Sequence, residues 1–263
     1  MIALPWTYLA LLSLGYGLAL IYGQLGWMAL ISIALLLIAG FAVRQQQIRI
    51  VPYLGHAVFI FMAVALAMHW LPGFHNGRVI APQRLTDDAV RFAMYLNLDK
   101  PLVDFWLLLV CPWIIGRRPL RLGVYATALG LLLGSLLALG GALLLGMISW
   151  APKWPDQAWL WVLNNLLLVT LVEEALFRGY VQGGLSRQFN HLPYGDNLAL
   201  LLASLLFGLA HAGAGWQWVL LASLSGLGYG LAYRFGGLGA AIVSHFGLNV
   251  LHFGLFTYPM LAS

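Results

Sequence analysis

The sequence predicts an all-α polytopic membrane protein, a bundle of about eight to nine transmembrane helices. Its composition is the first reason: of 263 residues, 62% are hydrophobic and only 8% are charged. The mean hydropathy is +0.88, which is high for a soluble domain of this size. Apolar runs close to the roughly 20 residues that a spanning helix needs recur along the chain.

Nine apolar runs are expected to form the spanning helices. The first is expected to be a retained helix, because the first basic residue is Arg44 and the charged start of a cleaved signal is missing. The fifth run is long and rich in glycine. The runs cover residues 6–22, 26–43, 53–71, 102–116, 122–148, 158–177, 198–212, 216–233 and 238–257.

The basic residues predict the orientation. The net charge of +5 reflects topology in such a chain, and no nucleic-acid partner is expected. One side of the bundle receives most of the arginines in short connections, so this side is predicted to be cytoplasmic, with the N-terminus inside. We expect a multi-pass protein of a bacterial cytoplasmic (inner) membrane. The arginines on that side are Arg44, Arg49, Arg117, Arg118, Arg121, Arg178, Arg187 and Arg234.

The segment 72–101 is the only sizeable loop that the sequence predicts. Asn76-Gly77 and Pro82 mark turns within it, and residues 90–98 are expected to form a short amphipathic helix on the membrane surface. A plain connector is the favoured interpretation of the whole segment, and a lid or a substrate-docking role is the alternative. The single cysteine, Cys111, excludes an internal disulfide and is interpreted as a small buried apolar residue.

The chain changes character near residue 150. Residues 1–150 are mostly aliphatic and are expected to form N-terminal transmembrane helices. Residues 155–257 carry carboxylates, histidines and amides inside their apolar runs. An ionised side chain at the bilayer centre costs about 2.5–3.5 kcal/mol, so such groups usually face a protein interior or a wet cavity. The functional site is therefore predicted in this second part.

Glu173 and Glu174 are adjacent, and the sequence assigns them different roles. Their side chains diverge by about 100° around a helix. Arg178 follows Glu174 at i+4, on the same face, and is poorly placed for Glu173. We therefore expect Glu174 and Arg178 to form a buried, charge-compensating pair that leaves Glu173 available. Two further pairs have the same spacing: Phe207 with His211, and His245 with Asn249.

This set of side chains suits hydrolysis of an amide bond. The carboxylate of Glu173 can take a proton from water, and a histidine can pass a proton to the leaving amine; such acid–base help contributes about 10²–10⁴-fold. His245 and Asn249, one turn apart, are suited to stabilise the oxyanion, where losing one donor costs about 10²–10³ in rate.

The motifs Glu-Glu-x-x-x-Arg, Phe-x-x-x-His and His-x-x-x-Asn, in this order and with the continuation Phe-Arg-Gly-Tyr, resemble the CAAX-protease and bacteriocin-processing family. These are glutamate-dependent intramembrane endopeptidases that include the type II CAAX prenyl proteases. The resemblance covers roughly residues 158–252 and implies that residues 155–257 are the protease core. It implies that Glu173 and His211 activate the water, that His245 and Asn249 form the oxyanion site, and that Glu174 and Arg178 support them.

The resemblance further implies a membrane-anchored protein or peptide as substrate, in contact with the bilayer, and no cofactor. A zinc-dependent membrane protease is the nearest alternative, since two histidines and a glutamate suit zinc. However, the chain has no His-Glu-x-x-His, and asparagine is a poor zinc ligand, so no metal is expected.

Three other classes remain as alternatives. A serine protease would use one of Ser204, Ser225 and Ser244 as nucleophile. A proton-coupled transporter would use a Glu/His relay, but no matching half-domains are visible. A non-catalytic membrane scaffold or immunity protein would keep the fold without the chemistry. His252, one turn past Asn249, is interpreted as structural.

Overall fold

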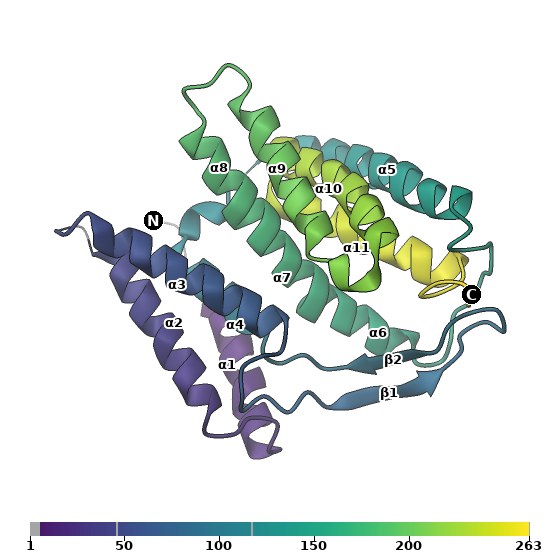
Figure 1. The fold of residues 1–263 in the computed structure, drawn as a ribbon, viewed down its shortest axis with the longest axis horizontal. Helices are drawn as coiled ribbons and strands as arrows, with labels where there is room; N and C mark the ends of the chain where they lie inside the picture. Colours follow the sequence, from purple (N-terminus) through teal and green to yellow (C-terminus); the bar gives the residue numbers. More distant parts are fainter. Residues whose placement is uncertain (1–5, 46, 117, 263) are drawn as a thin grey trace. The chain divides into compact units, whose positions relative to one another are not determined.

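The computed structural model describes residues 6–45, 47–116 and 118–262 (Figure 1). The described chain is mostly helical, as predicted, and its helices follow the nine predicted runs. It divides into two compact units. Unit 1 comprises Met1–Val79 and Tyr95–Pro112, and unit 2 comprises Ile80–Met94 and Trp113–Ser263.

The described residues of unit 1 form four helices, and α2 packs against both α3 and α4. Small residues allow the close approach of α2 and α3: a Cβ added to Gly55 would lie 2.8 Å from the Ala39 carbonyl oxygen. Phe59 and Trp106 stack with ring centroids 3.8 Å apart. The helices are α1 (Trp6–Ile21), α2 (Ala29–Arg44), α3 (Ile50–Ala67) and α4 (Pro101–Val110).

The predicted run 102–116 ends as a helix at Val110. Pro112 explains the early end, because proline disfavours helical geometry at the residue before it and has no N–H to donate. A short 3₁₀ turn, Pro112–Ile114, follows. Cys111 at this junction is buried, as predicted.

Unit 2 is built around α10, which packs against α5, α9 and α11. Gly237 has φ +81°, a conformation that favours glycine, and so allows α11 to begin directly after α10. The helices of this unit are α5 (Leu120–Leu144), α6 (Ala158–Asn164), α7 (Leu171–Glu174), α8 (Gly183–Gln188), α9 (Gly195–Leu209), α10 (Trp216–Gly236) and α11 (Leu238–Leu255).

The helices α6, α7 and α8 form one long segment (Figure 1). Wider π-helical turns at Asn165–Thr170 and Ala175–Gln182 join them without a break. The helix predicted over 158–177 therefore continues to Gln188. Glu173 and Glu174 lie on the four-residue α stretch between the two π stretches, a type of irregularity that is frequent at functional sites.

Four helical segments in the described part of the chain are long and apolar enough to cross a membrane. They are Ile50–Ala67, Leu120–Leu144, Ala158–Gln188 and Leu238–Leu255. The shorter helices Ala29–Arg44, Pro101–Val110 and Gly195–Leu209 are also apolar. The chain is thus a membrane protein, while a total of eight to nine spans stays a prediction.

The predicted amphipathic helix over residues 90–98 is wrong. This segment contains strand β2 (Phe92–Tyr95), which pairs with β1 (Arg78–Gln83) in a two-stranded sheet. Phe92 and Tyr95 are aromatic, and aromatic residues favour a half-buried strand. The loop is therefore a hairpin and not a surface helix.

Asp88, in the turn of this hairpin, anchors the end of the chain. Its carboxylate accepts hydrogen bonds from the Ser149 hydroxyl, at 3.0 Å, and from the Thr257 hydroxyl, at 3.3 Å. Hydroxyl groups around it, that of Thr86 first, hold the pKa of Asp88 below its usual value. The segment that follows α11 is thereby held to the hairpin.

Close contact between α5 and α10 predicts that Gly228→Ala destabilises unit 2. A Cβ at Gly228 would lie 2.6 Å from the Gly130 carbonyl oxygen and 2.8 Å from the Gly134 nitrogen, both rigid backbone atoms. We expect a loss of about 1–3 kcal/mol in the free energy of unfolding, measured by denaturant titration in micelles. Gly140→Ala, with no neighbouring atom within 4 Å, is the control and should cost nothing. Equal stability of the two variants would contradict the proposed backbone contact.

Candidate functional site

The pair of Glu174 and Arg178 is buried, as the spacing predicts. The Glu174 Oε2 and Arg178 Nε atoms are 3.2 Å apart, and both side chains are 0% exposed. Glu173 differs, because 24% of its side chain is exposed. The two adjacent carboxylates therefore occupy different environments, one enclosed with a counter-ion and the other accessible.

Aromatic rings enclose the guanidinium of Arg178. Its Cζ atom lies 4.7 Å from the centroid of the Phe207 ring and 5.6 Å from that of Tyr229, distances at which a cation is attracted to a ring face. Its Nη1 and Nη2 atoms are buried without a hydrogen-bond partner in the described part of the chain. Glu174 is therefore its principal polar neighbour, and the pair depends on both members.

His245, on α11, contacts both glutamates. Its Nδ1 is 2.9 Å from Glu174 Oε1, and its Nε2 is 4.0 Å from Glu173 Oε2. Because an ionised carboxylate only accepts hydrogen bonds, Nδ1 carries the proton of the first contact. The ring also stacks on Tyr229, with centroids 4.4 Å apart and planes 10° from parallel. These contacts fix the ring with Nε2 toward Glu173.

His211 lies just beyond the end of α9 and is held by its own helix. Its Nδ1 is 2.9 Å from the Phe207 carbonyl oxygen, which can only accept, so Nδ1 is the donor. In the neutral ring Nε2 is then a proton acceptor. The turn that follows consists of exposed or half-exposed alanine and glycine, residues 212–215. No hydrogen bond or ion pair joins His211 to Glu173 within the described residues.

Asn249 is positioned by an asparagine from another helix. Its Nδ2 donates to Asn165 Oδ1 at 3.1 Å, and the Thr170 hydroxyl donates to the same oxygen at 3.3 Å. Asn165 and Thr170 belong to the first π stretch, so this wide turn orients the amide of Asn249. The second N–H of that amide remains for another acceptor.

The histidines and Asn249 meet at one cavity of about 100 Å³ in unit 2. Glu173 is not among the residues that line the cavity, but its Oε2 lies 4.0 Å from Nε2 of His245, which does line it. Of the four residues for which catalytic roles are expected, three therefore share the cavity and the fourth lies beside it. The polar and aromatic lining includes His211, Ser225, Tyr229, His245, Asn249 and His252.

The serines considered as nucleophiles have no histidine partner in the described structure. The Ser225 hydroxyl donates to the Ala222 carbonyl oxygen at 3.0 Å, and that of Ser244 donates to backbone carbonyls. Ser204 Oγ is buried with no hydrogen-bond partner among the residues described. An activated serine needs a base within hydrogen-bond reach, so none of the three is arranged as one.

No group of three or more His, Cys, Asp or Glu side chains in the described residues has a geometry that would hold a metal ion. Glu173 has Glu174 beside it in the chain and His245 at 4.0 Å, and Glu174 is already engaged with Arg178. The zinc alternative therefore lacks a preformed ligand set in this structure.

Three residues of the site were not predicted as parts of it. Tyr229 supports His245, Asn165 orients Asn249, and His252 lines the cavity with its Nε2 atom buried and without a described partner. Asn165 carried a signal, since it is an amide inside an apolar run. Tyr229 carried little, because a tyrosine between glycines in a membrane helix fits many surroundings.

Residues 155–251 match the model of a protein family, Rce1-like, described as Type II CAAX prenyl endopeptidase Rce1-like. The matched segment contains all six residues to which the resemblance assigned roles, and it confirms that resemblance for this part of the chain. No curated protein and no solved structure matches the chain.

Proposed function

Since residues 155–251 are Rce1-like, and the family is one of membrane proteases, we propose that this protein is a glutamic-type intramembrane endopeptidase. It would hydrolyse a peptide bond of a membrane-associated protein or peptide with a water activated by Glu173. Glu174 and Arg178 would be positioning residues, and neither a cofactor nor a metal would take part.

One observation supports the proposal above the others: His245 contacts both glutamates. Its Nδ1 is tied to the buried Glu174, and its Nε2 is 4.0 Å from the accessible Glu173. A water molecule within hydrogen-bond reach of both Glu173 Oε2 and His245 Nε2 fits this separation. A structural ion pair alone needs only Glu174 and Arg178, so it does not account for Glu173.

In the proposed reaction, Glu173 takes one proton from the water as its oxygen attacks the carbonyl carbon of the substrate. The carbonyl π electrons move to its oxygen, which the second N–H of Asn249 would stabilise, joined by His245 Nε2–H when that ring carries both of its protons. The C–N bond then breaks, and the amine leaves with the proton first held by Glu173. His211 Nε2, whose ring is oriented by the Phe207 carbonyl, would relay that proton.

The structure supports a modified division of roles between the two histidines. The family resemblance pairs Glu173 with His211, whereas among the described residues Glu173 has an ion-pair contact with His245, at 4.0 Å. We propose that His245 both orients the water and stabilises the oxyanion, and that His211 acts in proton transfer. We further propose an inner-membrane location, an N-terminus inside, and residues 155–257 as the protease core.

A comparison of membrane peptidomes tests the proposed function. Cells with and without the protein are compared by mass spectrometry, and we expect at least one membrane-anchored precursor to accumulate when the protein is missing. Cleavage of that precursor by the purified protein should continue in excess chelator. Loss of cleavage in chelator with recovery on adding zinc would support the metalloprotease alternative. An unchanged peptidome under all conditions would favour the non-catalytic scaffold.

A further inference from the structure

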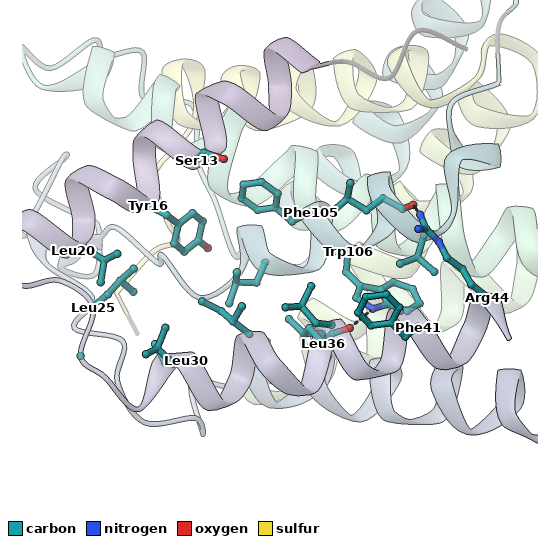
Figure 2. A pocket seen from close by; sticks show the side chains of 18 residues that line it. Ser13, Tyr16, Leu20, Leu25, Leu30, Leu36, Phe41, Arg44, Phe105 and Trp106 are labelled. Carbon is teal, nitrogen blue, oxygen red and sulfur yellow. Dashed lines mark hydrogen bonds between the residues drawn. The ribbon is translucent and has the colours of Figure 1, made fainter. Parts of the chain in front are cut away.

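Unit 1 contains an apolar groove of about 370 Å³ that is separate from the residues of the proposed reaction (Figure 2). Its volume lies in the range of sites that bind small molecules, about 300–1,000 Å³. Helices α1, α2 and α4 supply its walls, all from within this unit. The lining includes Tyr16, Leu20, Leu36, Leu37, Phe105 and Trp106.

The described lining of the groove runs from the α1–α2 connection to Arg44. Figure 2 shows α1 and α2 close together at Leu20 and Leu25 and diverging toward Arg44. The end away from Arg44 is a cluster of buried residues that includes Leu25 and Ala29. The Tyr16 hydroxyl donates to the Leu98 carbonyl oxygen and so fixes α1 to the start of α4. An elongated molecule lying in the groove would have one end at this cluster and the other at Arg44.

The polar atoms of the two aromatic side chains Tyr16 and Trp106 on the walls of the groove are already engaged. Trp106 Nε1 donates to the Leu36 carbonyl oxygen at 2.8 Å, and the Tyr16 hydroxyl is bound to Leu98. Phe105 meets Tyr16 edge to face at a centroid distance of 5.6 Å. The middle of the groove thus offers mainly carbon to an occupant, which is the surface that a hydrocarbon chain needs.

Arg44 is the charged residue in the described lining of the groove and lies at the end opposite the buried cluster. It is the last residue of α2, it is exposed, and its Nη2 donates to the Leu109 carbonyl oxygen at 2.5 Å. None of the ion pairs within the described residues involves it. This hydrogen bond orients the guanidinium, whose remaining N–H groups suit the oxygens of a phosphate.

The helix α2, which lines the groove, is long enough to accompany a lipid through one leaflet. The sixteen residues of α2 extend roughly 24 Å, at about 1.5 Å each. Half of a bilayer's hydrocarbon core measures about 15 Å. A chain that starts at Arg44, at the membrane surface, therefore reaches the bilayer centre before the buried cluster at the other end of the groove.

We propose that this groove holds one phospholipid with an anionic headgroup, its phosphate at Arg44 and one acyl chain between α1 and α2 on α4. The occupant is a resident lipid of the membrane. The proposal does not depend on the proteolytic function, because none of its residues belongs to that site.

Spin-labelled lipids test the proposal on the reconstituted full-length protein. The protein is placed in phosphatidylcholine vesicles with a trace of spin-labelled phosphatidylglycerol or phosphatidylcholine, and the motionally restricted fraction of each probe is measured. We expect a preference of about fivefold for phosphatidylglycerol, the factor typical of one basic residue at a lipid surface. Arg44→Gln should abolish the preference, whereas Arg49→Gln, at an exposed arginine outside the groove, should keep it.

A second pair of variants tests the acyl-chain position. Leu37 lines the groove, and Leu37→Trp would fill it. Ile38→Trp places the same bulk at the neighbouring position, which is outside the lining. The two positions are similarly exposed, Leu37 at 54% and Ile38 at 62%. Only Leu37→Trp should lower the restricted fraction. Equal effects of the two arginine variants, or of the two tryptophan variants, would overturn the proposal. Displacement of the probe by a soluble prenylated peptide would overturn it as well, in favour of a site for a substrate tail.

Discussion

Glu173→Gln is expected to lower the rate of peptide cleavage by at least about 10²-fold while the protein keeps its fold and abundance. Glutamine has nearly the same shape, but its amide cannot take a proton from water. Because 24% of the Glu173 side chain is exposed and its ion-pair contact with His245 is at 4.0 Å, the change leaves no fully buried charge unpaired. The measurement is the single-turnover rate on the precursor found in the peptidome comparison, with melting temperature measured in parallel.

Asp196→Asn is the matched control for this substitution. It makes the same carboxylate-to-amide change at a side chain that is 54% exposed and 3.7 Å from Arg234. Its rate should equal that of the wild type. If Glu173→Gln retained full activity, Glu173 would not be the base and the glutamate mechanism would fail. If Glu173→Gln lost activity because it unfolds, its melting temperature would fall as well. An unchanged melting temperature would assign the lost activity to the missing base.

The second large effect is expected on stability, at Glu174. Glu174→Leu leaves the Arg178 guanidinium buried without its counter-ion, and such a loss costs about 3–5 kcal/mol. It also removes the acceptor of His245 Nδ1. Reversible unfolding in mixed micelles measures the change. Glu174→Leu combined with Arg178→Met should recover much of the stability but not the activity, because His245 stays unsupported.

An exposed ion pair again provides the control. Asp196→Leu breaks the pair with Arg234 at the surface, where such pairs contribute about 0–1 kcal/mol. A stability loss at Glu174 no larger than at Asp196 would mean that the Arg178 charge is not enclosed. If the double variant were no more stable than the single one, the uncompensated charge would not be the cause of the loss.

Helix positions were predictable because each apolar run has a length set by the membrane. The run 238–257 corresponds to α11, Leu238–Leu255, within two residues. The boundaries failed where a single residue outweighs hydropathy, as at Pro112, which ends α4 before the apolar run itself ends. The hairpin was missed because a short segment such as 90–98 has apolar spacing that suits a strand or a helix equally.

Local geometry of the site was predictable and its tertiary contacts were not. Helical spacing is enough to join Glu174 to Arg178 and to leave Glu173 apart. Spacing says nothing of how α11 lies against α7, so the contact of His245 with both glutamates could not be foreseen. The same holds for Asn165, whose bond to Asn249 joins residues 84 positions apart in the chain.

The alanine and glycine that follow His211 have a consequence for selectivity. A polypeptide laid along residues 212–215 meets backbone groups and side chains no larger than a methyl group on its way to the imidazole. This turn discriminates poorly among the side chains of a substrate. It has no bulky side chain that would exclude a large residue and no polar side chain that would bind a small one. In a protease with such a turn, the choice of cleavage site depends on the other residues that line the cavity, which include Met147, Trp218 and Leu221.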